Sequence, residues 1–100
     1  MRRRVSVYDP DLIADDPQIR RLDYALKRVG NEVLRAIDRF PAMNSPHEGK
    51  AVIEEELDEL WEHCRANTGR SPEAITEAIQ IAAMAVRYVL DLSESRGGDV

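Results

Sequence analysis

The sequence is poor in cysteine and histidine, with one cysteine and two histidines among 100 residues. A single cysteine excludes an internal disulfide, and these three residues cannot build a structural zinc site, which needs four such ligands. Cys64 falls on an apolar helical stripe, so we expect a buried thiol in a reducing compartment. This reasoning predicts a cytoplasmic protein.

Long apolar runs and a basic face are missing as well. No apolar segment approaches the roughly 20 residues that span a bilayer. The start, MRRRVSVYDPD, has no apolar stretch behind its arginines and is not typical of a secretory signal. The net charge is −5, and the basic residues form no continuous face. We therefore expect neither a membrane nor a nucleic acid as a partner.

No segment alternates apolar and polar residues with period two, so we expect no sheet. Instead, proline follows a polar residue at three places, after Asp16, Ser45 and Ser71. This order is typical of a helix N-cap and first helical residue. The sequence predicts an all-α fold, an antiparallel bundle of three main helices with or without a short fourth. We place these helices at about residues 17–40, 45–67 and 72–92.

One hundred residues fit a single small domain, residues 1–100. We expect residues 1–15 to form a mobile arm, residues 17–92 the helical core and residues 93–100 a frayed tail. The third predicted helix is apolar around nearly its whole circumference. Such a helix is buried on all sides, and two other helices cannot easily surround it. We therefore predict that a second subunit completes the bundle, in a homodimer or a dimer of dimers.

Acidic residues concentrate in the second predicted helix. The segment Ser45–Arg65 holds seven of the nineteen acidic residues. At 3.6 residues per turn, Glu56 and Glu59 lie beside an apolar stripe formed by Ile53, Leu57, Leu60 and Cys64. An unpaired carboxylate at such a border is costly. Two of them one turn apart indicate either a bound cation or a solvated acidic face.

The short loop TGRS, residues 68–71, predicts that the second and third helices form an antiparallel hairpin. Its midpoint lies near residue 68, which makes Glu59 level with Glu77, and Glu56 level with Gln80. Four oxygen-bearing side chains then converge between two helices. Oxygen ligands without thiols favour Mg²⁺ or Mn²⁺. A di-iron bundle would need Glu-x-x-His on two helices, which this sequence lacks.

Two segments that carry these residues, SPHEGKAVIEEELDELW and EAITEAIQIAAMAVRYVLDL, resemble the MazG-like all-α nucleoside triphosphate pyrophosphohydrolases. That family has Glu-Glu-x-x-Glu on one helix and Glu-x-x-Asp on the next. Glu55, Glu56 and Glu59 match the first motif. Glu77 begins the second motif, but Gln80 replaces its aspartate. The resemblance covers about residues 17–92.

The resemblance implies hydrolysis of a nucleoside triphosphate to the monophosphate and pyrophosphate. It makes Glu56, Glu59 and Glu77 metal ligands, with Gln80 as a neutral fourth, in a Mg²⁺ site that also accepts Mn²⁺.

Four other side chains are candidates for the same reaction. Glu55 is a candidate for activating the attacking water, or a surface acid. Lys50 and Arg87 are candidate phosphate contacts, and His63 lies one turn from Glu59. The alternative is a non-catalytic helical dimer that binds nucleotide or a protein partner without turnover.

Overall fold

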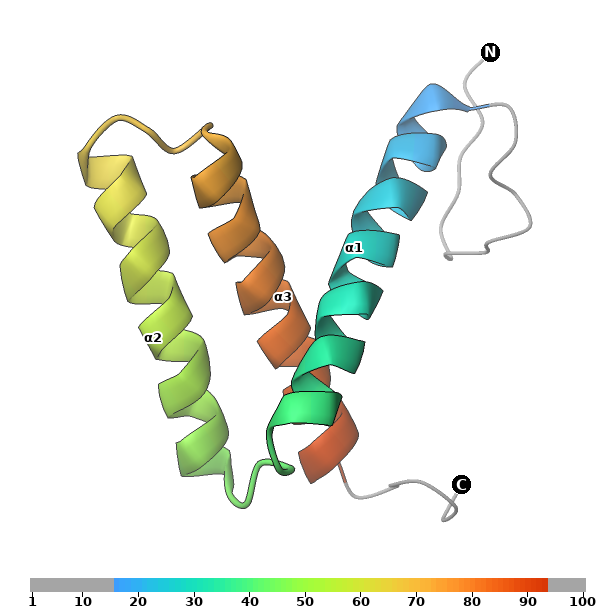
Figure 1. Ribbon diagram of the computed structural model, residues 1–100, viewed down its shortest axis with the longest axis vertical. Coiled ribbons are helices and arrows are strands. Elements are labelled where there is room, and N and C mark those ends of the chain that lie inside the picture. Colours follow the sequence, from blue (N-terminus) through green and yellow to red (C-terminus); the bar gives the residue numbers. More distant parts are fainter. Residues whose placement is uncertain (1–15, 94–100) are drawn as a thin grey trace.

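The computed structural model describes residues 16–93, and expectations for residues 1–15 and 94–100 lie outside this range. The described chain forms three α-helices and no strand (Figure 1): α1 (Pro17–Arg39), α2 (Pro46–Arg65) and α3 (Pro72–Leu92). The all-α prediction is confirmed, whereas a fourth helix is not found within residues 16–93. No helix in this range combines the length and apolar composition that a membrane span requires.

Each helix begins as the sequence predicts, with a polar N-cap followed by proline. The caps Asp16, Ser45 and Ser71 have extended backbones, and their side-chain oxygens accept hydrogen bonds from the first-turn amides. Those oxygens replace partners that the helix itself cannot supply. At α2, the Glu48 carboxylate also accepts a 2.6 Å hydrogen bond from the amide of Asn44. The helix starts are therefore fixed by local sequence alone.

Helix α2 ends at Arg65, close to the predicted limit of about residue 67, and asparagine forms its stop signal. Asn67 adopts a positive φ of 61°. The amide of Thr68 donates to the carbonyl of His63 at 2.8 Å, and that of Asn67 donates to the carbonyl of Cys64 at 3.1 Å. This pair of bonds is a Schellman motif, in which asparagine takes the left-handed position usually given to glycine.

The helices α2 and α3 run antiparallel, side by side, as a hairpin (Figure 1). Helix α1 runs in the same direction as α3, meets it near their C-terminal ends and diverges from it toward Pro17. Only Val33 and Ala36 of α1 are buried, both in its second half. The first half of α1 therefore has no buried side chain in a single chain.

The core of one chain is small. Its buried apolar residues are Val33, Ala36, Met43, Ala74 and Ala83, and no large side chain is fully buried within residues 16–93. Cys64 is exposed, so the prediction of a buried thiol was wrong for the single chain. The partly covered residues of α2 include Ile53 and Leu60 of the predicted stripe, and also Val52, Glu56 and His63. This side is rotated from the predicted stripe toward the carboxylates, which leaves Leu57 and Cys64 exposed.

Candidate metal centre

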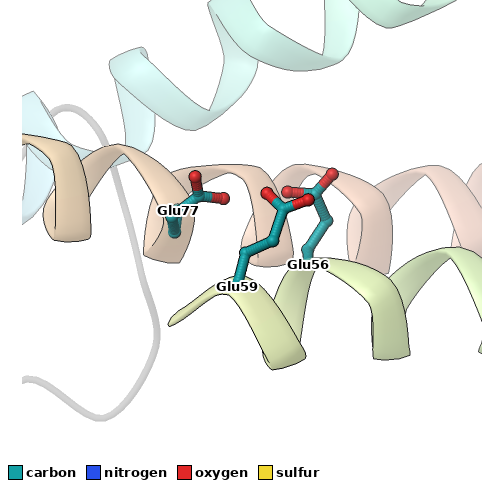
Figure 2. A group of neighbouring side chains, drawn as sticks. All are labelled: Glu56, Glu59 and Glu77. Atoms are coloured by element: carbon teal, nitrogen blue, oxygen red, sulfur yellow. The ribbon is translucent and has the colours of Figure 1, made fainter. Parts of the chain in front are cut away.

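Three carboxylates from two helices meet in the hairpin. Glu56 and Glu59 project from α2 and Glu77 projects from α3, each offering one oxygen, and these oxygens all lie within 4.8 Å of one another (Figure 2). Glu56 and Glu77 are half-buried, whereas Glu59 is exposed. We call these three residues the carboxylate cluster. The equal spacing of the two helices from their loop brings them together, as the sequence analysis predicted.

The fourth predicted residue, Gln80, lies at the same place. With its amide nitrogen turned inward, it donates to Glu56 Oε2 at 2.8 Å and to Glu77 Oε1 at 3.3 Å. A half-turn of the amide presents its oxygen to the same place instead. Gln80 can therefore be a donor to the carboxylates or a fourth oxygen ligand beside them.

The pKa values of Glu56 and Glu59 are raised, in part by the charges of neighbouring carboxylates. Burial raises the pKa of Glu56 from 4.5 to about 7, assisted by a hydrogen bond with Glu77 and by the charges of Glu59, Glu77 and Glu55. The pKa of Glu59 is raised as well, first by its hydrogen bond with Glu77 and then by the charge of Glu77. Such mutual repulsion is relieved by a proton or by a cation. None of the ion pairs among the described residues includes a member of the cluster.

The residues present fit a hard divalent cation. Oxygen ligands at about 2.1 Å from Mg²⁺ lie at most about 4.2 Å apart, and those around larger ions lie further apart. The cluster separation of up to 4.8 Å is within one ångström of that limit. Since glutamate side chains are flexible, small rotamer changes close this difference.

Glu55 is adjacent to the cluster but is not one of its members. It faces a cavity of about 400 Å³, which lies between the hairpin and the C-terminal end of α1. The cavity has apolar walls from Val52, Phe40 and Met84 and also contains arginine side chains from α1. Sequence reasoning missed it, because its second wall is supplied by α1 across a non-local contact.

The predicted phosphate contacts lie in other environments. Lys50 is exposed and reaches Glu54 at 3.3 Å. His63 Nδ1 lies 3.2 Å from Thr68 Oγ1 at the end of α2. Neither side chain belongs to the carboxylate cluster.

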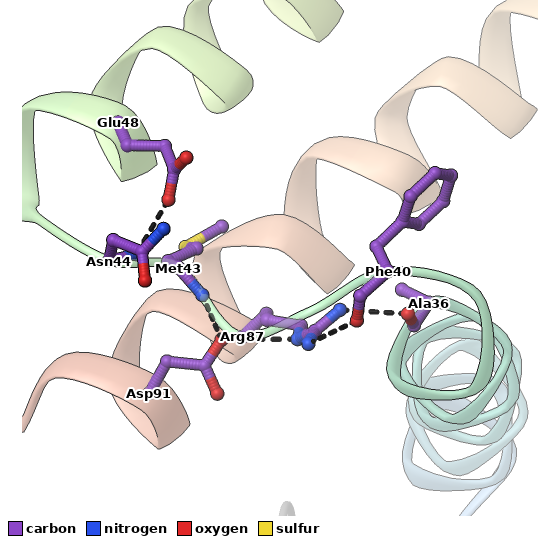
Figure 3. A network of polar contacts seen from close by, with 7 residues as sticks. All are labelled: Ala36, Phe40, Met43, Asn44, Glu48, Arg87 and Asp91. Atoms are coloured by element: carbon purple, nitrogen blue, oxygen red, sulfur yellow. Dashed lines mark hydrogen bonds and ion pairs between the residues drawn. The ribbon is translucent and has the colours of Figure 1, made fainter.

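Arg87 is buried and holds α1 against α3 (Figure 3). Its guanidinium donates to the carbonyl of Ala36 at 2.8 Å and to that of Phe40 at 2.9 Å. Its Nε lies 3.1 Å from Asp91 Oδ2, an ion pair outside hydrogen-bond geometry. The same Asp91 oxygen accepts the amide of Met43 at 2.9 Å. We call these contacts the Arg87 network, and they assign Arg87 a structural role.

The network adds side-chain donors at the C-terminal end of α1. Arg87 is a second donor to the carbonyl of Ala36, which already accepts the amide of Phe40 at 2.9 Å, and it also donates to the carbonyl of Phe40. The only sequence signal for it was the spacing of Arg87 and Asp91, four residues apart on one helix face. That spacing did not reveal which carbonyls the arginine would meet.

No family model, curated protein or solved structure matches this chain. The resemblance to the MazG-like enzymes therefore stays a prediction.

Proposed function

We propose that this protein is a metal-dependent nucleoside triphosphate pyrophosphohydrolase that uses Mg²⁺, with Mn²⁺ as a substitute. The observation that carries the proposal is the convergence of Glu56, Glu59 and Glu77 on one point, with Gln80 beside them. The raised pKa of Glu56 supports it, because it marks a place where positive charge is stabilising. The type of reaction is inferred from the resemblance to the MazG-like motifs.

In this proposal Glu56, Glu59 and Glu77 hold the cation, and Gln80 turns its amide oxygen toward it. A cation bound there neutralises negative charge on the phosphate oxygens of the substrate. Glu55 accepts a proton from the attacking water. The water oxygen forms a bond to the α-phosphorus, the bond from that phosphorus to the bridging oxygen breaks, and pyrophosphate leaves.

The cavity beside Glu55 is the proposed place for the nucleoside. Its volume of about 400 Å³ is within the usual range for small-molecule sites. Arg35 and Arg39 line it and take the phosphate-binding role first given to Arg87, whose guanidinium donates to the carbonyls of Ala36 and Phe40. Lys50 and His63 stay as candidates that approach the substrate only after a side-chain movement.

We further propose that the protein acts as a homodimer, or as a dimer of dimers, in the cytoplasm. The supporting observation is the small core of a single chain, which leaves twelve large apolar side chains exposed within residues 16–93. A domain of this size needs extensive apolar burial to offset its conformational entropy. A second chain supplies the missing burial.

The test is a screen of ribo- and deoxynucleoside triphosphates with Mg²⁺, in which pyrophosphate and orthophosphate are measured separately. We expect pyrophosphate from at least one nucleotide, loss of the product with a chelator, and recovery with Mn²⁺. Glu56→Gln is the inactive control, and Glu62→Gln, on the same helix but outside the cluster, should keep the activity. Absence of pyrophosphate from every nucleotide at high protein concentration would contradict the proposed reaction.

A second function is a helical dimer that binds nucleotide without turnover. Gln80 favours it, because an amide that donates to Glu56 and Glu77 stabilises the carboxylates without any cation. Calorimetry with a non-hydrolysable nucleotide distinguishes the two functions. Binding without any pyrophosphate release from the hydrolysable form would select the second function.

A further inference from the structure

The hairpin has a second face, opposite the carboxylate cluster, that is apolar and uncovered. At 3.6 residues per turn, Ile75, Val86 and Val89 of α3 lie on the side away from Glu77 and Gln80. Leu57 and Trp61 of α2 lie on the side away from Glu59. All five apolar side chains are at least 40% exposed. We call these five residues the outer face. Exposed apolar side chains grouped on one side of two helices indicate an interaction site.

The apolar stripe on the first half of α1, residues 17–32, is uncovered as well. None of these residues is buried. Leu22 and Leu26 lie one turn apart on the stripe that continues into the buried Val33, and they are 46% and 40% exposed. We call residues 17–32 the α1 arm. Its apolar stripe could pack against another helix, but α3 diverges from α1 along this segment (Figure 1).

The charges of the two uncovered surfaces are opposite. The arm carries four basic and two acidic residues, and helical spacing places Arg20 and Lys27 on one side of its apolar stripe and Arg21 and Arg28 on the other. Helix α2 carries two basic and seven acidic residues. Within it, Asp58 and Glu54, the latter paired with Lys50 at 3.3 Å, border Leu57 and Trp61 on the outer face. The arm is net basic, although Asp23 pairs with Lys27, and it thus complements a helix that is net acidic.

We infer that the α1 arm of a second copy of this chain seats on the outer face, so that each chain of a two-fold dimer covers the hairpin of the other. This inference rests on the homodimer of the proposed function and specifies its interface. The geometry explains why α1 diverges from its own α3, because the arm packs on the partner instead. It is also isologous, so both interfaces of the dimer form together.

Charge reversal tests this pairing directly. One variant reverses the arm (Arg20→Glu, Arg21→Glu, Lys27→Glu and Arg28→Glu), and a second reverses the face (Glu54→Lys and Asp58→Lys). Each variant alone sets like charges against each other at both interfaces, so its dimer should dissociate about 100-fold more readily. An equimolar mixture pairs opposite charges at both interfaces, so a heterodimer of nearly parental affinity should form. Sedimentation equilibrium at low salt measures all three affinities.

The control is Arg70→Glu, which reverses an exposed basic residue in the loop between α2 and α3 and should leave the dimer unchanged. Circular dichroism verifies that each variant keeps its helices. Parental affinity in both reversed variants, or reversed variants that stay monomeric when mixed, overturns the inference. So does a parent chain that is a folded monomer at low micromolar concentration. Because the readout is association, none of these results depends on pyrophosphate release.

Discussion

Two regions of this protein place charged side chains between helices, and they differ in what surrounds the charge. In the Arg87 network, a buried guanidinium meets two carbonyls and one carboxylate. In the carboxylate cluster, three acids meet one another, and the single neutral neighbour Gln80 relieves them only in part. A buried charge with matching partners stabilises a fold. A group of like charges weakens it, which is why such groups mark candidate binding sites.

The first prediction removes the buried charge that has matching partners, the guanidinium of Arg87. Arg87→Ala removes the side-chain donor from the carbonyls of Ala36 and Phe40 and the cation that pairs with Asp91, while the carbonyl of Ala36 keeps the amide of Phe40 as a donor. We expect the free energy of unfolding to fall by about 3 kcal/mol, since loss of one partner from a buried charged network is strongly destabilising. Urea denaturation measures it. The control is Arg35→Ala, which removes an exposed ion pair with Glu32 and should lose less than about 1 kcal/mol. Equal effects of the two changes would contradict the structural role of Arg87.

The second prediction concerns the close packing at the same end of the hairpin. A Cβ added at Gly49 would lie 2.5 Å from Tyr88 Cδ2 and 3.2 Å from Met43 Sδ. Gly49→Ala should therefore destabilise the protein by about 1–3 kcal/mol through overpacking, although alanine is the better helix former. Gly30→Ala is the matched control, because no atom lies within 4 Å of its added Cβ. It should be neutral or stabilise by up to about 1 kcal/mol. Thermal denaturation of both variants decides.

The third prediction removes one of the mismatched charges. The folded pKa of Glu56, about 7, lies above its ordinary value of 4.5. Between these values the folded state binds more protons than the unfolded state, so stability should fall as pH rises from about 4.5 to 7. Glu59 acts in the same direction. In Glu56→Gln the fall should be shallower, and at pH 8 without divalent cations this variant should melt at a higher temperature than the parent.

Thermal melts at several pH values, with a chelator present, measure that difference. Glu62→Gln is the control on the same helix and should keep the parental pH dependence. Added Mg²⁺ should raise the melting temperature of the parent at pH 8 and have little effect on Glu56→Gln, because a cation stabilises only the state that binds it. Parallel pH curves for the parent and Glu56→Gln would show that Glu56 carries no unfavourable charge.

The same contrast separates what the sequence could predict from what it could not. The helix starts follow from local chemistry at Asp16, Ser45 and Ser71, and the convergence of Glu59 with Glu77 follows from counting residues about one loop. Both features depend only on neighbouring residues or on the number of residues between each side chain and the loop. The contacts of Arg87 depend on where α1 crosses α3, which no periodicity fixes.

The exposure of Cys64 was missed for a related reason. The prediction assumed that the apolar stripe of α2 is the buried side, whereas the covered side is rotated toward Glu56. The rotation brings the acids of both helices into contact and leaves Leu57 and Cys64 uncovered. Hydrophobic patterning within one helix finds an apolar face but does not say which neighbour covers it.

The last and smallest effect is expected at Gln80. Its neutral amide partly relieves the repulsion among the three carboxylates, whereas an acid at this position would add to it. An amide oxygen can ligate a hard cation but contributes no charge. Gln80→Asp adds a fourth carboxylate, which should tighten Mn²⁺ binding about three- to tenfold while destabilising the metal-free protein by repulsion. The shorter side chain opposes part of this gain, because it reaches less far from α3. Asn31→Asp, on an exposed part of α1, adds the same charge away from the cluster and should change neither property.

Calorimetric Mn²⁺ titrations of the parent, Gln80→Asp and Glu56→Gln, with and without a non-hydrolysable nucleotide, compare the ligands directly. We expect weak binding in the free parent and clear binding with nucleotide, since phosphate oxygens supply ligands that three glutamates and an amide do not. Glu56→Gln should lose nearly all binding under both conditions. Parental binding by Glu56→Gln would remove Glu56 from the ligand set and contradict the metal centre. An unchanged affinity in Gln80→Asp alone would place residue 80 outside the coordination shell, with three carboxylates holding the ion.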